Sequence, residues 1–289
     1  MAKKGESERR RKGFMESKTI HQITPGELRT FMSRHRESDY LLLDVRQPEE
    51  YTEAHIPGAK LIPLPELEDR LGEVSGNRDV VFYCRSGKRS RAGAMFASDA
   101  DHVGGALYNL TGGITAWNGE TLSEFPNVRV FEQAQSREEL LLQAMDLEKG
   151  AWRFYQTLLG RFGSEPYSHV FELLAKEEEA HARLIHHHLQ KAGRVQPAFG
   201  EAFEGLEGGL LESGESLEDA VERMEDLDGD RCLHLMEMSL NVEYAAYDLH
   251  RTIAEQSEEE ETREAFWSIA QAEKGHMRTI TKAIRMCGG

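Results

Sequence analysis

A single cysteine, Cys84, stands between an apolar run and a group of basic and hydroxyl residues in "VVFYCRSGKRS". The thiolate is the nucleophilic form of cysteine, and nearby cations and free backbone N–H groups lower its pKa. An amphipathic run follows, so the pattern predicts a helix N-terminus whose N–H groups face the sulfur. A buried structural cysteine is the alternative, and the cations disfavour it. The predicted substrate-binding loop comprises Arg85, Ser86, Gly87, Lys88, Arg89 and Ser90.

A second group of reactive residue types lies in the C-terminal half. In two helical segments a glutamate precedes a histidine by three residues, so the two side chains share one helix face. Each of two other segments offers one glutamate, 30 residues before the glutamate of its neighbour. Four helices therefore bring four carboxylates and two imidazoles to one level. The predicted metal ligands are Glu148, Glu178, His181, Glu243, Glu273 and His276.

Four glutamates without counter-ions in a helical core cost several kcal/mol each, on the order of a buried unpaired charge. Two divalent cations remove that cost, and two glutamates plus two Glu-x-x-His pairs form the di-iron carboxylate pattern. Carboxylate and imidazole ligands suit iron or manganese. Because this half of the chain is rich in glutamate, an exposed helix face is the alternative. The matched spacing of all six residues favours two Fe ions, with Mn as the other metal.

The elements that must hold Cys84 belong to an α/β domain. Two runs rich in aliphatic and aromatic residues, 40–46 and 79–84, read as strands, and "TPGELRTFMSRH" and "RSRAGAMFAS" read as helices. Alternating strands and helices predict a mainly parallel sheet with both faces covered. From Ser136 onward the sequence pattern predicts helices, because apolar residues recur at helical spacing over 137–160, 166–192, 217–256 and 260–285. Four helices with a Gly-rich middle connection predict an antiparallel bundle with a crossover.

Length and charge agree with two domains. The 289 residues divide into a basic tail at 1–17, which we expect to be disordered, an α/β domain at 18–128 and a helical bundle at 136–289. Residues 128–289 carry 17 basic and 32 acidic side chains, a balance of −15 that disfavours nucleic acid as a partner.

The N-terminus lacks the apolar core of a signal peptide, and no apolar run is long enough to span a membrane, so we expect a cytoplasmic protein. We expect Cys232 to be a core residue and Cys287 to be a mobile free thiol.

The N-terminal motifs carry a family resemblance. "LLLDVRQPEEYTEAHIPGAKLIPLPEL", "VVFYCRSGKRS" and "LYNLTGGITAW" together resemble the single-domain rhodanese sulfurtransferases over about residues 20–120. The resemblance implies that Cys84 accepts a sulfane sulfur as a persulfide and passes it to a thiol. It also implies supporting roles at the edge of the site for Asp44 and Arg46. Tyrosine-phosphatase loops place an arginine six residues after the cysteine, and this chain has Ser90 there, so sulfur is favoured over phosphate.

The C-terminal half resembles the rubrerythrin branch of the ferritin-like proteins over about residues 136–286. "LEKGAWRFYQTL" and "LLAKEEEAHARLI" carry this resemblance. It implies that Tyr155, seven residues after Glu148, hydrogen-bonds a ligand carboxylate. His250 holds the equivalent position in the other repeat, which is a departure. Ala246 is another, because the peroxidase rubrerythrins carry an additional ligating glutamate there.

The two halves together predict a sulfurtransferase whose persulfide chemistry at Cys84 is coupled to redox chemistry of peroxide, O₂ or the persulfide itself at a di-iron site. Two independent activities, or a bundle that binds or senses iron without catalysis, are the alternatives. The expected partners are a small sulfane-sulfur donor, a thiol acceptor and an external electron donor. We also expect a homodimer, and neither nucleic acid nor a membrane as a partner.

Overall fold

The computed structural model describes residues 18–287 apart from 75, 125, 192–196 and 225–229. The tail predicted at 1–17 lies outside the described residues. The chain divides into two compact units. The first contains residues 18–35, Asp39–Pro48 and Leu61–Gly119, and the second contains Arg36–Ser38, Glu49–Lys60 and the described residues from Glu120 onward.

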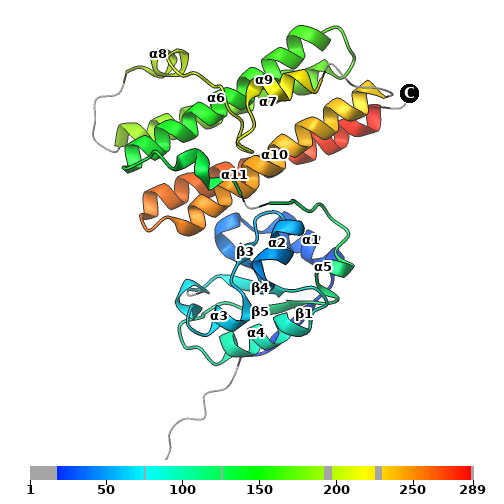
Figure 1. The fold of residues 1–289 in the computed structure, drawn as a ribbon, viewed down its shortest axis with the longest axis vertical. Helices are drawn as coiled ribbons and strands as arrows, with labels where there is room; N and C mark the ends of the chain where they lie inside the picture. The colour runs from blue at the N-terminus through cyan, green and yellow to red at the C-terminus, as the bar shows by residue number, and fades with distance from the viewer. Residues whose placement is uncertain (1–17, 75, 125, 192–196, 225–229, 288–289) are drawn as a thin grey trace, which may run out of the picture. The chain divides into compact units, whose positions relative to one another are not determined.

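The first unit is built on a parallel sheet, which confirms the predicted α/β class (Figure 1). The five strands lie in the order β1-β5-β4-β2-β3, and the pairs β1–β5, β5–β4 and β4–β2 are all parallel. Their bounds are β1 Ile20–Ile23, β2 Tyr40–Asp44, β3 Lys60–Leu61, β4 Asp79–Tyr83 and β5 Leu107–Leu110. The helices between them in sequence are α1 Pro25–Arg34, α2 Pro48–Glu53, α3 Leu64–Leu67, α4 Lys88–Ser98 and α5 Gly113–Ala116. Helix α2 belongs to the second unit from Glu49 onward.

The centre of the sheet explains where Cys84 lies. Strands β2 and β4 are buried along almost their whole length, as expected for a parallel sheet covered on both faces. In Figure 1, α1 and α4 lie on opposite sides of this sheet. Strand β4 ends at Tyr83 and α4 begins at Lys88, so Cys84 opens the loop at the carboxyl end of a central strand. Ligands of open α/β sheets bind at this edge.

The second unit contains four long helices, and this confirms the predicted bundle (Figure 1). They are α6 Arg137–Phe162, α7 Ser168–Lys191, α10 Arg231–Gln256 and α11 Glu260–Ala283. Helices α6 and α7 pack together, as do α10 and α11, and each pair is joined by a short link. The prediction of one helix over 217–256 is wrong. A short helix, α9 Leu217–Glu222, precedes α10, which begins where the Asp230 side chain accepts the backbone N–H of Leu233.

The apolar core of the bundle is divided by a belt of charged side chains. One buried cluster includes Phe154, Phe171, Leu235 and Ile280, and another includes Leu141, Ile185, Leu249 and Phe266. Along each long helix the predicted ligands fall between the residues of one cluster and those of the other. The packing of both clusters therefore fixes the level at which the charged side chains meet.

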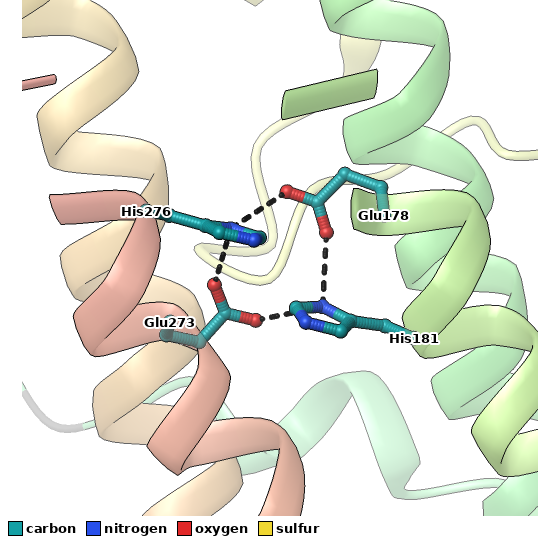
Figure 2. A group of neighbouring side chains, drawn as sticks. All are labelled: Glu178, His181, Glu273 and His276. Atoms are coloured by element: carbon teal, nitrogen blue, oxygen red, sulfur yellow. Dashed lines mark ion pairs between the residues drawn. The ribbon is translucent and has the colours of Figure 1, made fainter. Parts of the chain in front are cut away.

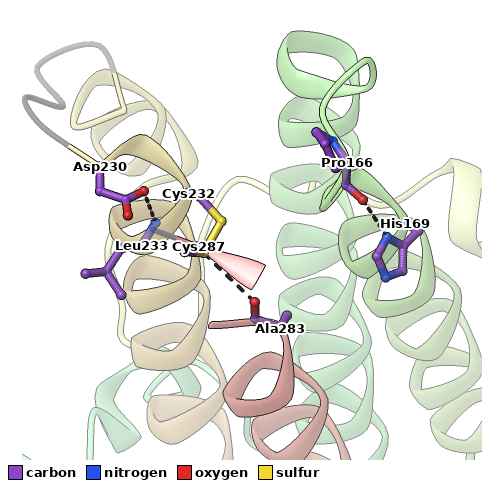
Figure 3. The surroundings of a disulfide bond; sticks show 7 residues. All are labelled: Pro166, His169, Asp230, Cys232, Leu233, Ala283 and Cys287. Atoms are coloured by element: carbon purple, nitrogen blue, oxygen red, sulfur yellow. Dashed lines mark hydrogen bonds between the residues drawn. A yellow bond between two sulfur atoms is a disulfide. The ribbon is translucent and has the colours of Figure 1, made fainter. Parts of the chain in front are cut away.

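A disulfide joins Cys232 to Cys287 at one end of the bundle (Figure 3). The two Cα atoms lie 5.3 Å apart although 55 residues separate them in sequence. The prediction of a mobile free thiol at Cys287 is therefore wrong. Because α10 and α11 form a hairpin, the start of α10 and the segment that follows α11 lie at the same end, which brings the two sulfur atoms together.

In the parts of the chain that the structure describes, no helix combines the length and the apolar character that crossing a membrane requires.

Candidate functional site

The loop after β4 wraps its backbone around the sulfur of Cys84. Cys84 is buried and is a free thiol. The backbone N–H of Gly87 lies 3.1 Å from its Sγ, and the Ser90 hydroxyl lies 3.4 Å from it. Gly87 has φ +89°, which favours glycine, and it caps the N-terminus of α4. The loop therefore presents donors to one sulfur atom from the first turn of a helix.

These donors lower the pKa of the Cys84 thiol. Burial alone would raise the pKa, but hydrogen bonds from the Ser90 hydroxyl and from the backbone N–H groups of Ser90, Ser86 and Gly87 hold it below its ordinary value. The Ser90 hydroxyl also lies 2.6 Å from Asn109 Oδ1 on β5, so its position is fixed from a second strand. The thiolate, which is the nucleophile, is thus favoured by donors that are already in place.

The neighbouring α5 segment closes against the loop. The backbone N–H of Ile114 donates to the Cys84 carbonyl at 2.8 Å. A Cβ atom on Gly113 would lie 2.1 Å from that carbonyl oxygen, so this approach requires glycine. The "GG" of the third motif therefore supports the cysteine loop from outside it.

The other residues predicted for this site take different positions. Arg46 forms a buried two-pronged ion pair with Asp44, with Nε–Oδ1 and Nη2–Oδ2 distances of 3.0 and 2.6 Å. The side chains of Arg85 and Lys88 are exposed, and that of Arg89 is half-buried. The exposed cations are available to a solvent-borne anion, whereas the Asp44–Arg46 pair braces the end of β2.

In the bundle, two glutamates and two histidines from α7 and α11 form a closed ring of ion pairs (Figure 2). His181 Nδ1 lies 3.2 Å from Glu178 Oε2 and 3.2 Å from Glu273 Oε1. His276 Nδ1 lies 3.0 Å from Glu273 Oε2 and 3.4 Å from Glu178 Oε1. All four side chains are buried, and their ligand atoms lie within 4.8 Å of one another.

The remaining two predicted ligands complete this group symmetrically. Glu148 on α6 lies 3.2 Å from His181 Nδ1, and Glu243 on α10 lies 2.8 Å from His276 Nδ1. The Tyr155 hydroxyl donates to Glu243 Oε1 from the opposite repeat. Burial raises the pKa of Glu148 to about 8, although His181 opposes the shift. Burial also raises the pKa of Glu243 well above its ordinary value. The structure thus brings all six predicted ligands together.

His250 lies closer to the ligand atoms than its sequence position suggested. Its Nε2 is 3.5 Å from Glu148 Oε1, and its Nδ1 is 3.9 Å from Glu273 Oε1. The ring is fully buried, and burial lowers its pKa to about 4, so it is a neutral imidazole. With Glu148 and Glu273 it forms a second group able to hold a metal ion. Tyr155 and His250 therefore differ, because one donates to a carboxylate and the other offers a nitrogen lone pair.

Comparisons with known proteins agree with this geometry. The rubrerythrin family model matches residues 139–284. The chain belongs to the rubrerythrin family. It also carries a rhodanese-like domain, matched over residues 24–120. The cysteine loop lies within the rhodanese-like domain and the carboxylate–histidine group within the rubrerythrin domain.

Sequence relatives match the rhodanese-like domain. A sulfurtransferase from Allochromatium vinosum is 40% identical over 79 residues, which cover 27% of this chain and 72% of that protein. An HTH-type transcriptional regulator, Rv0324 from Mycobacterium tuberculosis, is 40% identical over 33% of this chain and 40% of its own length. The chain thus spans less than half of that regulator. A rhodanese-like domain protein from Staphylococcus aureus is similar in structure, with 28% identity, a TM-score of 0.32, and coverage of 36% of this chain and 98% of that one.

The rubrerythrin family implies a di-iron site, and the donor atoms of this chain fit one. Buried atoms without a hydrogen-bond partner among the described residues include both carboxylate oxygens of Glu273, Glu148 Oε1 and both ring nitrogens of His250. Buried polar atoms are normally satisfied, so this group of carboxylate oxygens and imidazole nitrogens at one level fits a bound cation. Carboxylate oxygens with imidazole nitrogens suit iron or manganese.

No sequence pattern singled out one buried acidic residue of this unit, Glu212. Glu212 lies in the connection between α7 and α10, and its side chain is buried. Burial, together with the charges of Glu148 and Glu178, raises the pKa of Glu212 well above its ordinary value. A loop residue takes part in no helical periodicity. The available signal was an acid placed directly after the apolar "LL" in a Gly-rich connection.

Proposed function

We propose that the protein is a sulfurtransferase that carries a sulfane sulfur on Cys84 as a persulfide. We further propose that oxidation of this persulfide delivers electrons to a metal centre in the rubrerythrin domain. The observation that carries the first part is the set of donors around the Cys84 sulfur, from Gly87, Ser90 and the start of α4. They favour the thiolate and offer hydrogen bonds to a charged sulfur atom bound to it. The sulfurtransferase relatives support the same activity.

Loading requires a donor with a weak sulfur–sulfur bond, such as thiosulfate. The Cys84 thiolate attacks the outer sulfur, a new S–S bond forms, and the old S–S bond breaks with its electron pair leaving on sulfite. The product is a persulfide anion within reach of the Gly87 and Ser90 donors. In transfer, an acceptor thiolate attacks the outer sulfur, and Cys84 leaves as a thiolate stabilised by the same donors. Each step conserves charge and needs no external oxidant.

The coupled reaction adds an oxidation. The persulfide anion and a second thiolate join as a trisulfide, and this step releases two electrons. The acceptor of these two electrons would be iron held by the rubrerythrin domain. The residues that would hold it are Glu148, Glu178, His181, Glu243, Glu273 and His276, with His250 facing two of them. The presence of both domains in one chain supports the coupling.

An anaerobic experiment tests the coupling. The full-length protein is loaded with iron and oxidised, thiosulfate and a thiol are added, and the ferric absorbance is followed in wild type and in Cys84→Ser. We expect bleaching in the wild type and none in the variant. Cys232→Ser/Cys287→Ser is the matched control, because it removes the other two cysteines and keeps Cys84. Equal bleaching in wild type and Cys84→Ser, or bleaching in neither, would contradict the coupling and leave two independent activities.

A further inference from the structure

The connection that precedes α9 is held firmly against α6. The backbone N–H of Gly208 donates to Asp146 Oδ1 at 3.0 Å, and Arg153 Nη1 donates to the Gly208 carbonyl at 3.1 Å. A Cβ atom on Gly150 would lie 1.9 Å from the Leu210 carbonyl oxygen, so the loop approaches α6 at a point where α6 has no side chain. Gly150 is two residues after Glu148 on that helix. The loop therefore crosses α6 at the level of the metal ligands.

The loop also closes on itself around Glu212. The backbone N–H of Leu211 donates to the Glu215 carbonyl at 2.9 Å, and that of Leu217 donates to the Gly209 carbonyl at 2.9 Å. Leu211 belongs to one of the two apolar clusters of the bundle, which anchors the inner side of the turn. These contacts fix the direction in which the Glu212 side chain leaves the backbone. Figure 2 shows a pale yellow loop behind the ring of side chains, in the colour of this segment.

In this loop an apolar side chain is exposed and an acidic side chain is buried, which is the reverse of the usual distribution. Leu210 is 42% exposed, whereas Glu212 is 1% exposed. Its Oε2 has no hydrogen-bond partner among the residues described. Burial, with the charges of Glu148, Glu178 and Glu273 as further causes, raises the pKa of its carboxyl group well above the ordinary value. A buried carboxylate with an open oxygen costs several kcal/mol, on the order of an unpaired buried charge, unless a cation lies against it.

The geometry points to Glu212 as an additional carboxylate ligand of the metal centre, supplied by the connecting loop rather than by a helix. This inference rests on the proposed metal site. Helix α10 carries Ala246 one turn after Glu243, so that turn provides one carboxylate. Glu212 supplies a further negative charge from another direction. Carboxylate oxygens are among the ligands that suit manganese and other hard cations.

The test replaces the carboxylate by its neutral isostere. Co²⁺ is titrated anaerobically into metal-free full-length wild type, Glu212→Gln and the control Glu207→Gln, which makes the same change on an exposed side chain of the same loop. Calorimetry gives the number of ions and their affinities, and the visible Co²⁺ bands report the ligand set. We expect Glu212→Gln to weaken at least one ion by about tenfold or more and to change the bands. Glu207→Gln should match the wild type.

The outcomes separate two failures. If the wild type does not bind two ions, the proposed metal site is wrong. If the wild type binds two ions and Glu212→Gln binds them with the same affinity and the same bands, the site stands and the role of Glu212 is wrong. The metal-free Glu212→Gln protein should be as stable as the wild type or more stable, because a buried carboxyl group is replaced by an uncharged amide of the same shape. Should that variant lose the fold, Glu212→Asp, which withdraws the carboxylate by one methylene, must show the same loss of affinity.

Discussion

The two reactive regions of this chain are built in opposite ways. The donors to Cys84 come from a contiguous segment, ending at Ser90, and are largely backbone N–H groups. The metal group is assembled from side chains of four helices, between Glu148 and His276. A local site depends on the conformation of one loop, whereas an assembled site depends on the packing of a whole domain. Each should therefore survive damage to the other.

The largest effect is expected from Cys84→Ser. Without a thiolate no persulfide forms, so sulfur transfer from thiosulfate to cyanide should fall by more than about 10³-fold, as for loss of a covalent nucleophile. Metal content and the free energy of unfolding should not change. Thiocyanate formation and metal analysis measure the two halves of this prediction. Retention of transfer in the variant would place the nucleophile elsewhere.

The disulfide gives the converse test. Replacing both Cys232 and Cys287 by serine should lower the free energy of unfolding by about 2–4 kcal/mol, because a long loop is no longer closed in the unfolded chain. Transfer through Cys84 should stay at the wild-type rate. Denaturant unfolding with and without a reductant measures the difference, and reduced wild type should match the variant. Equal stability of oxidised and reduced wild type would show that the disulfide does not stabilise the bundle.

At the metal group, Glu273 offers the sharpest test because its two oxygens face both histidines. Structural zinc sites contribute about 10–16 kcal/mol through about four ligands, or about 2.5–4 kcal/mol for each ligand. The loss of a ligand of similar strength in Glu273→Gln should therefore weaken metal binding by about 100-fold. Sulfur transfer should be unaffected. Glu264→Gln, on an exposed position of the same helix, is the control. Calorimetry measures the metal affinity of the wild type and of both variants. Equal affinities in the three proteins would contradict the six-ligand assignment.

The same contrast explains what the sequence could and could not predict. Residues three apart on a helix, such as Glu178 and His181, must share a face, so the sequence alone could group them. Cys232 and Cys287 meet through the α10–α11 hairpin, and no local pattern records that contact. Glu212 lies in a loop, where side-chain direction follows from tertiary hydrogen bonds.

Secondary structure was also predictable where local sequence signals decide it and not where tertiary contacts do. Apolar periodicity located the four long helices, yet it extended through residues 217–256, where the structure has two helices. Helix α10 begins where Asp230 caps it, and apolar periodicity alone does not detect a capping residue. Strand β3 has two residues, too few for any pattern, and it is recognisable only from its place beside β2. Local signals thus located the elements, and tertiary contacts set their limits.

The smallest effect, and the finest test of the local site, is expected from Ser90→Ala. The Ser90 hydroxyl is one of the groups that lower the pKa of Cys84, so its loss should raise that pKa. The thiolate is the reactive form, and a raised pKa moves the rise of reactivity to higher pH. A hydrogen bond to a charged group contributes about 1.5 kcal/mol, so alkylation by iodoacetamide at pH 7 should slow by about tenfold. At high pH, where both proteins are thiolates, the rates should converge.

Ser86→Ala is the matched control, since Ser86 acts on the sulfur through its backbone N–H, which alanine retains. Its pH profile should overlay that of the wild type. If Ser86→Ala and Ser90→Ala shifted equally, the loop would respond to any lost hydroxyl, and the contact from Ser90 would carry no special weight. If neither shifted, backbone donors alone would hold the thiolate. The cysteine site would then depend still more completely on loop conformation, and its difference from the side-chain-built metal group would be sharper.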